Sequence, residues 1–185
     1  MPAEDSLRGL WDIHKIQQVY LTYAVSMDSH QWDLMDQCFL EDAEIRLSAL
    51  AVKLSGGIET LTFRGWQSMC RQIDPTFDMI QHYIYSPLIR LDGDIAYTRV
   101  YFVAQHVKNA LAPEPIFTLG GWYNGELVRR GDDWRIAKHE LVDTWISGNP
   151  EVIQAGSLEM GAAERVDGHR APSWLLASAQ PAQGL

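Results

Sequence analysis

Apolar side chains in the first forty residues recur at helical spacing. The longer set is Ile13, Ile16, Val19, Tyr20, Tyr23, Ala24 and Met27. Positions three and four apart lie on one face of a helix, so this set predicts a helix that starts at Asp5 or Ser6 and runs to about Ser26. A shorter set, Trp32, Met35 and Phe39, predicts a second, short helix.

The next segment mixes several signals. Residues from Ala43 to Leu47 alternate between apolar and polar and predict a strand. The stretch from Ala51 to Phe63 fits neither period, although Gly56-Gly57 indicates a turn. A further helix is predicted from Trp66 to Ile73, where Pro75 ends it.

The second half of the chain is dominated by strands. Four long strand-like runs are Met79 to Leu91, Ile95 to Val107, Ile116 to Val128 and Trp134 to Trp145. Short Gly-Asp turns at 92–94 and 131–133 predict antiparallel pairing of their neighbours. Helices followed by long antiparallel strands predict an α+β fold, in which a strongly curved sheet wraps a helix and leaves a concave ligand pocket.

The composition changes after Gly148 toward Gly, Ala, Ser and Pro. We therefore predict a domain over residues 1–148 and a tail or arm over 149–185. Trp174, Leu175 and Leu176 are the strong apolar cluster of the tail. They predict either a lid over the pocket or a contact with another subunit; a loosely ordered tail is the alternative.

Composition narrows the range of partners. The chain has 185 residues and a net charge of -9, which disfavours nucleic acid and anionic lipid. No apolar run reaches the roughly 20 residues of a membrane span, and residues 1–8 lack a signal-peptide core. Cys38 and Cys70 have neither metal nor redox spacing, so we expect reduced thiols in a cytoplasmic protein, with no metal and no cofactor.

Candidate chemistry lies in two parts of the chain. Met27-Asp28-Ser29 follows the first predicted helix, whereas Gln81-His82-Tyr83 and Gln105-His106 lie in the strand-like half, ahead of Gly120-Gly121 and Trp134. An Asp at a helix end is usually a cap, and a His in a strand is usually a core residue. The layout over residues 7–147, however, resembles the SnoaL-like branch of the NTF2-like superfamily, the scytalone dehydratase-like enzymes included.

The resemblance implies a role for each candidate. In these enzymes an Asp after the first helix orients a His on the central sheet, and the His acts as a base in an elimination; Asp28 and His82 match these positions. A carboxylate on one ring nitrogen fixes the tautomer and stabilises the imidazolium. His106 matches a second active-site His that binds substrate oxygen, or else faces solvent. Tyr23 matches an assisting tyrosine, or else packs in the core.

The chain departs from scytalone dehydratase at the substrate-binding positions. Two tyrosines of that enzyme correspond to Met27 and Leu47, which have no hydroxyl, and a Ser and an Asn correspond approximately to Gly121 and Tyr123. The resemblance therefore implies a more apolar pocket for a cyclic or polycyclic substrate. We expect Tyr23, Met27, Leu47, Tyr123 and Trp145 to contact it.

Three functions remain open from the sequence. The first is a cofactor-independent lyase of the dehydratase type, or an isomerase, with Asp28, His82 and His106 in catalysis. The second is a non-catalytic small-molecule-binding protein on the same fold. The third is the small structural subunit of a ring-hydroxylating dioxygenase, against which the Asp-His pair argues. By analogy with the family, we expect a homo-dimer or homo-trimer.

Overall fold

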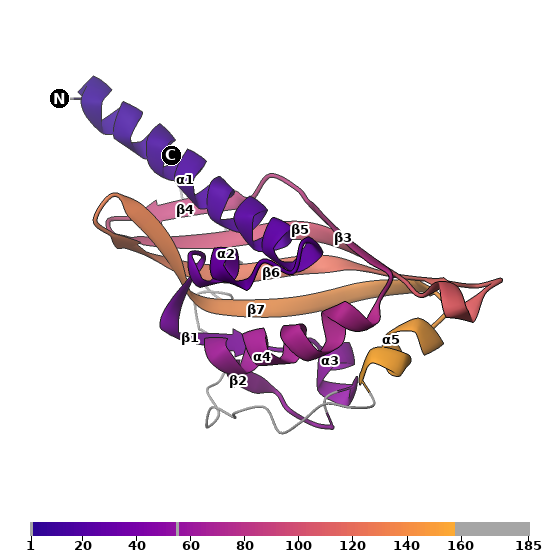
Figure 1. Cartoon of the computed structure of the whole chain (residues 1–185). Coiled ribbons are helices and arrows are strands. Elements are labelled where there is room, and N and C mark those ends of the chain that lie inside the picture. The colour runs from indigo at the N-terminus through magenta and orange to yellow at the C-terminus, as the bar shows by residue number, and fades with distance from the viewer. Residues whose placement is uncertain (1, 55, 158–185) are drawn as a thin grey trace, which may run out of the picture.

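A long helix and a seven-stranded sheet form the body of the protein. The computed structural model describes residues 2–54 and 56–157. The α-helices in chain order are α1 (Pro2–Asp28), α2 (Trp32–Asp36), α3 (Ala49–Leu54), α4 (Phe63–Ile73) and α5 (Glu151–Ser157), with 3-10 turns η1 (Asp74–Thr76) and η2 (Asn109–Leu111). Figure 1 shows α1 lying diagonally across the sheet.

The strands are β1 (Phe39–Arg46), β2 (Thr60–Thr62), β3 (Met79–Ile84), β4 (Leu88–Asp92), β5 (Ile95–Val107), β6 (Ile116–Arg130) and β7 (Asp133–Gly148). Their order is β2-β1-β7-β6-β5-β3, and β4 also pairs with β5. All pairs are antiparallel except β1 with β7. The predicted α+β class, with helices packed on a curved and mostly antiparallel sheet, is confirmed.

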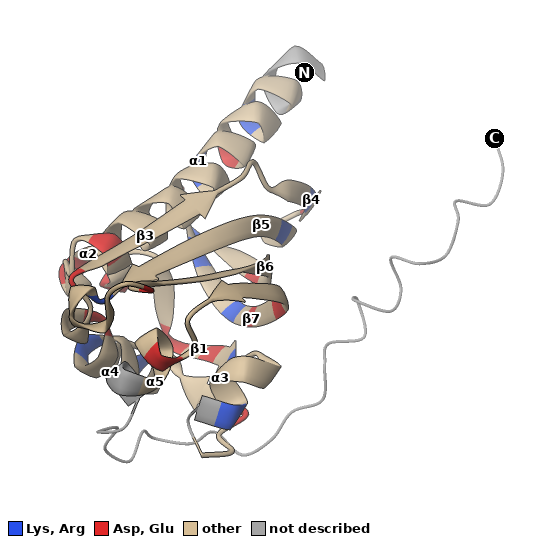
Figure 2. Ribbon diagram, turned by 90° about the vertical axis from the view of Figure 1, so that its right-hand side faces the viewer, with Lys and Arg blue, Asp and Glu red and all other residues tan. Residues whose placement is uncertain are grey.

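The apolar face of α1 explains how the helix is held. Ile16, Tyr20, Tyr23 and Met27 are each at most 3% exposed and pack into the same core as Trp134 and the inward side chains of the sheet. The helix extends from Pro2 to Asp28, beyond the predicted ends. In Figure 2 its N-terminal turns project past the sheet.

Two further stretches of the chain have more elements than the sequence predicts. The run from Met79 to Leu91 is two strands, β3 and β4, separated at 85–87, where Pro87 has no N–H to donate to the ladder. Both strands pair with β5, so they lie end to end along the same edge of that strand. The unassigned stretch from Ala51 to Phe63 holds the later part of the helix α3, which begins at Ala49, and the short strand β2. Both elements are too short to show a period.

Helix α4 begins at Phe63, earlier than predicted. The hydroxyl of Thr62 accepts a hydrogen bond from the backbone N–H of Gly65 at 3.1 Å and caps the helix. At the other end Pro75 lies within η1, and the chain turns there before entering β3. This turn carries Asp74 to the edge of the sheet's concave side.

Asp12 of α1 and Arg129 of β6 form a largely buried ion pair. Asp12 is 4% exposed, and its carboxylate accepts hydrogen bonds from Nη1 and Nη2 of Arg129 and, at 3.0 Å, from the indole N–H of Trp134. The Arg129 guanidinium lowers the pKa of Asp12. The pair joins α1 to the β6–β7 hairpin and is part of the core.

The chain after the sheet folds back as α5. Val152 is fully buried, and α5 packs against α4, β5, β6 and η1. The predicted apolar cluster Trp174 to Leu176, and its role as lid or subunit contact, lie outside the described residues. Within the described part, no helix is both long and apolar enough to cross a membrane.

Candidate active site

The carboxylate of Asp28 and the imidazole of His82 are hydrogen-bonded. Asp28 is the last residue of α1, and His82 lies in the middle of β3. His82 Nδ1 lies 2.7 Å from Asp28 Oδ1, and the backbone N–H of His82 donates to both carboxylate oxygens at 3.1 and 3.0 Å. An ionised carboxylate accepts but does not donate, so in the neutral form of the ring Nδ1 carries the proton and Nε2 keeps its lone pair.

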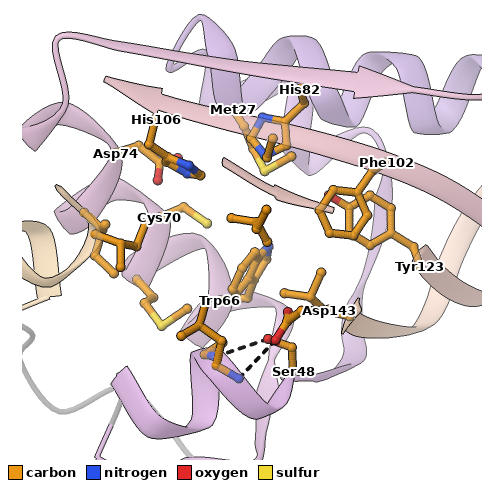
Figure 3. Close-up of a pocket in the computed structure, with 18 residues that line it drawn as sticks. Met27, Ser48, Trp66, Cys70, Asp74, His82, Phe102, His106, Tyr123 and Asp143 are labelled. Carbon is orange, nitrogen blue, oxygen red and sulfur yellow. Dashed lines mark hydrogen bonds between the residues drawn. The ribbon is translucent and has the colours of Figure 1, made fainter. Parts of the chain in front are cut away.

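His82 is one wall of an apolar cavity of about 140 Å³. The cavity lies between α4, α5 and the concave side of the sheet, and its side chains are drawn in Figure 3. The apolar lining is Met27, Leu50, Ala51, Trp66, Met69, Cys70, Ile73, Phe102, Ala104, Leu119, Leu141 and Ile153. Polar groups therefore face the cavity at a few points, as in sites that orient an apolar ligand.

His106 lies in the same cavity, next to His82. Ile80 pairs with His106 and His82 with Ala104 across β3 and β5, so the two imidazoles are diagonal neighbours on one face of the sheet, with centroids 6.3 Å apart. His106 is 8% exposed, and its Nδ1 has no hydrogen-bond partner among the described residues. Burial, and then the charge of His82, lowers the pKa of His106 to about 3, so this ring stays neutral.

A second acid, Asp74, also faces the cavity and was not singled out from the sequence. It is partly buried at the start of η1, and no hydrogen bond or ion pair among the described residues reaches its carboxyl group. Burial, followed by the charge of Asp28, raises the pKa of Asp74 to about 8. No local pattern marks it, because the apolar surroundings come from distant segments.

A further polar group lies on the far side of the cavity from His106 and Asp74 in Figure 3. Asp143 Oδ2 accepts the backbone N–H of Leu50 at 3.1 Å, whereas Oδ1 is buried without a partner among the described residues. Ser48, 4% exposed, lies on the same side and lines the cavity with it. This side therefore offers acceptors and a hydroxyl group.

The predicted substrate contacts divide into two groups. Met27 and Tyr123 line the cavity. Tyr23 and Leu47 are buried elsewhere in the core, and the Tyr23 hydroxyl accepts the indole N–H of Trp66 at 2.9 Å. Trp145 is 47% exposed and lies over Gly120. These three do not line the cavity in this structure.

His139 of β7 lies in the core and does not line the cavity. It is 2% exposed and enclosed by the rings of Tyr23, Phe39 and Tyr123. Neither ring nitrogen has a partner among the described residues, and burial lowers its pKa to about 3. It is a neutral core residue. Among the described residues, no three His, Cys, Asp or Glu side chains are grouped as metal ligands.

Comparison with known proteins places this chain in a family. A SnoaL-like domain matches residues 8–140. An uncharacterized protein of Mycobacterium tuberculosis is 30% identical over 135 residues, which are 72% of this chain and 86% of that protein.

Two solved structures show the same fold. A hexachlorocyclohexane dehydrochlorinase, LinA-type3 of Novosphingobium barchaimii, superposes with a TM-score of 0.65 at 16% identity, over 78% of this chain and 94% of that one. A candidate scytalone dehydratase of Novosphingobium aromaticivorans superposes with a TM-score of 0.64 at 17% sequence identity, over 89% of this chain and 99% of that one. With the domain match covering most of the chain, this protein belongs to the SnoaL-like domain family.

Proposed function

We propose that this protein is a lyase or isomerase that acts on a small, largely apolar cyclic or polycyclic molecule by proton transfer through His82. The observation that carries the proposal is the 2.7 Å contact between Asp28 and His82 at the wall of an apolar cavity. The dehydrochlorinase and candidate dehydratase of the same fold support the reaction class by analogy.

The chemistry follows from the tautomer. With its proton on Nδ1 and held by Asp28, His82 presents the Nε2 lone pair as a general base. When Nε2 takes a proton from carbon, the carboxylate of Asp28 stabilises the imidazolium that forms. The apolar lining strengthens this interaction, because fewer water dipoles screen it. Neutral His106 is placed to donate one hydrogen bond to a substrate oxygen.

The test is a reaction that needs only a base in an apolar site. 5-Nitro-1,2-benzisoxazole opens when the proton on C3 is removed: the C–H pair completes a nitrile, the N–O bond breaks, and a coloured nitrophenolate is released. We expect His82→Gln to lower kcat/KM by about 10²- to 10⁴-fold. His14→Gln, which changes an exposed His on α1, is the control.

Two outcomes would contradict the proposal. Unchanged kcat/KM in His82→Gln would reject the base assignment. Binding of 2-naphthol, followed by quenching of tryptophan fluorescence, with no turnover by the wild-type protein would favour the non-catalytic binding protein instead.

A further inference from the structure

The cavity holds an acid as well as a base. His82 lies on β3 with Asp28 behind it, whereas Asp74 reaches the cavity from η1, a different element. Figure 3 shows Asp74 and His106 on one side of the pocket, with His82 between them and the stacked rings of Phe102 and Tyr123. A molecule in the cavity therefore meets a proton acceptor and a carboxyl group together.

Among the described residues, no cation pairs with the Asp74 carboxyl group; the Lys108 ammonium donates instead, at 3.0 Å, to the backbone carbonyl of Thr76, on the same 3-10 turn as Asp74. The titratable groups that line the cavity are Asp74, Cys70 of α4, His82 of β3, His106 of β5, Tyr123 of β6 and Asp143 of β7, with Asp28 of α1 behind His82. None of them is Lys or Arg. A carboxylate in apolar surroundings near another carboxylate is disfavoured relative to the neutral acid, and the pKa of Asp74 is accordingly raised to about 8.

The other candidates are poorer proton donors. His106 has already lost its second proton at neutral pH, because its pKa lies at about 3, and neutral imidazole is a very weak acid. Burial raises the pKa of the Tyr123 phenol above its usual value. The Tyr23 hydroxyl does not line the cavity and is occupied by Trp66. A neutral carboxylic acid is the strongest acid among these groups.

From this placement we propose that Asp74 is the catalytic acid that protonates a departing oxygen, and that the substrate is a hydroxylated compound that loses water. The inference rests on the proposed function of His82 and adds the leaving group. A chloride ion leaves without a proton, but hydroxide is a poor leaving group and must leave as water. A protonated acid in the cavity is therefore useful for an alcohol and has no role for a halide.

The step is balanced in protons and electrons. His82 Nε2 takes the proton from carbon, and the C–H pair becomes the new C=C bond. The C–O bond breaks, its electron pair stays on oxygen, and that oxygen takes the proton of Asp74. The products are an alkene, water, the His82 imidazolium and the Asp74 carboxylate. Return of one proton from His82 to Asp74, directly or through water, restores both groups.

Two benzisoxazoles that differ in leaving group test the acid. Unsubstituted 1,2-benzisoxazole expels a more basic phenolate than the 5-nitro compound, so proton donation to that oxygen matters more. We expect Asp74→Asn to lower kcat/KM for the unsubstituted compound at least about tenfold more than for the nitro compound. Asp78→Asn, which changes an exposed Asp nearby, is the matched control. Equal losses for both compounds in Asp74→Asn would overturn the proposal.

A second measurement does not depend on turnover. The carboxyl carbon of Asp74, assigned in ¹³C-aspartate-labelled protein by its disappearance in Asp74→Asn, should titrate near pH 8. Titration near pH 4 would overturn the assignment even if His82 proves to be the base. Conversely, if the wild-type protein opens neither benzisoxazole while Asp74 titrates near pH 8, the proposed function of His82 is rejected, whereas the protonated state of Asp74 at neutral pH is supported.

Discussion

At the scale of single residues, the protein keeps several ionisable groups neutral by burying them. His106 and His139 are both nearly inaccessible, and burial lowers the pKa of each to about 3. Burial acts in the opposite direction on acids and raises the pKa of the Cys38 thiol to about 12. Desolvation disfavours the charged form in every case. In its contacts, His82 is unlike His139: its Nδ1 is hydrogen-bonded to the carboxylate of Asp28, whereas neither nitrogen of His139 has a partner among the described residues.

The neutral state of His139 predicts a loss of stability in acid. Its pKa is lower in the folded protein than the ordinary value of about 6.5 in the unfolded chain. Its contribution is therefore complete above about pH 6.5 and is lost as the pH falls toward 3. We expect His139→Phe to remove about 1 to 2 kcal/mol of the decrease in unfolding free energy between pH 7.5 and 5. Urea denaturation at both pH values measures this.

Burial also lowers the pKa of His106, so His106 too destabilises the folded protein in acid. In His139→Phe the decrease in unfolding free energy between pH 7.5 and 5 should therefore become smaller without disappearing. A His139→Phe protein with the same pH dependence as the wild type would show that His139 is already charged or solvated in the folded state. His14→Phe, at an exposed position, controls for the loss of a histidine.

At the scale of elements, close backbone approach shapes the sheet. The β6–β7 pairing shifts register between Gly120 and Gly121. A Cβ built on Gly121 would lie 1.9 Å from the carbonyl oxygen of Val142, which is backbone and cannot rotate away. At Gly120 the obstacle is the indole of Trp145, at 2.4 Å, and that side chain is half exposed. The two glycines are therefore required for different reasons.

These contacts predict unequal costs for one added methyl group. Gly121→Ala should destabilise the protein by about 3 kcal/mol or more, because the strands must separate. Gly120→Ala should cost about 1 kcal/mol, because Trp145 can move into solvent. Thermal unfolding of both variants measures the difference, and equal melting temperatures would contradict the backbone explanation.

The attachment of α1 to the sheet is another feature at this scale. Asp12 holds Arg129 and Trp134, whose sequence positions are more than a hundred residues away. We expect Asp12→Ala to cost about 3 to 5 kcal/mol, because it leaves a largely buried guanidinium and an indole N–H without a partner. Lys138→Ala, which breaks the more exposed ion pair with Glu126, should cost no more than about 1 kcal/mol. Similar losses in both variants, measured by urea denaturation, would refute this.

At the scale of the whole molecule, the outer face of the sheet exposes large apolar side chains. Met79, Tyr83, Tyr101 and Trp145 are each between 45% and 48% exposed. Tyr101 packs edge-on against Trp122 of the neighbouring strand, with ring centroids 5.9 Å apart. An apolar face of this kind is typical of a surface that binds another protein. It is the surface on which we expect the predicted homo-dimer or homo-trimer to form.

Charge introduced on this face should dissociate the assembly. We expect Tyr101→Glu to convert an oligomer into monomers at micromolar concentration, as measured by size-exclusion chromatography with light scattering. Val25→Glu replaces an equally exposed apolar residue on α1 and should leave the assembly intact. Dissociation by Val25→Glu alone would place the interface on the helix instead.

Local sequence patterns determined many of the helices, strands and turns of this protein. The helical spacing of apolar residues predicted α1, and the alternation of apolar and polar residues predicted the long strands β5 to β7. Gly-Asp pairs predicted the turns that precede β5 and β7. The resemblance of a few motifs to a family predicted a pair between Asp28 and His82, which are 54 positions apart in the sequence and hydrogen-bonded in the structure. These features are encoded within short windows of sequence or within motifs.

Tertiary structure alone decided the rest. The parallel pairing of β1 with β7 and the burial of Asp12 join segments that no window spans. Asp74 differs from the solvated Asp78 only in what folds around it: α4, α5 and the sheet remove water from one carboxyl group and leave the other exposed. Desolvation depends on every segment that contacts a group, and so the acid in the cavity became visible only once the chain was folded.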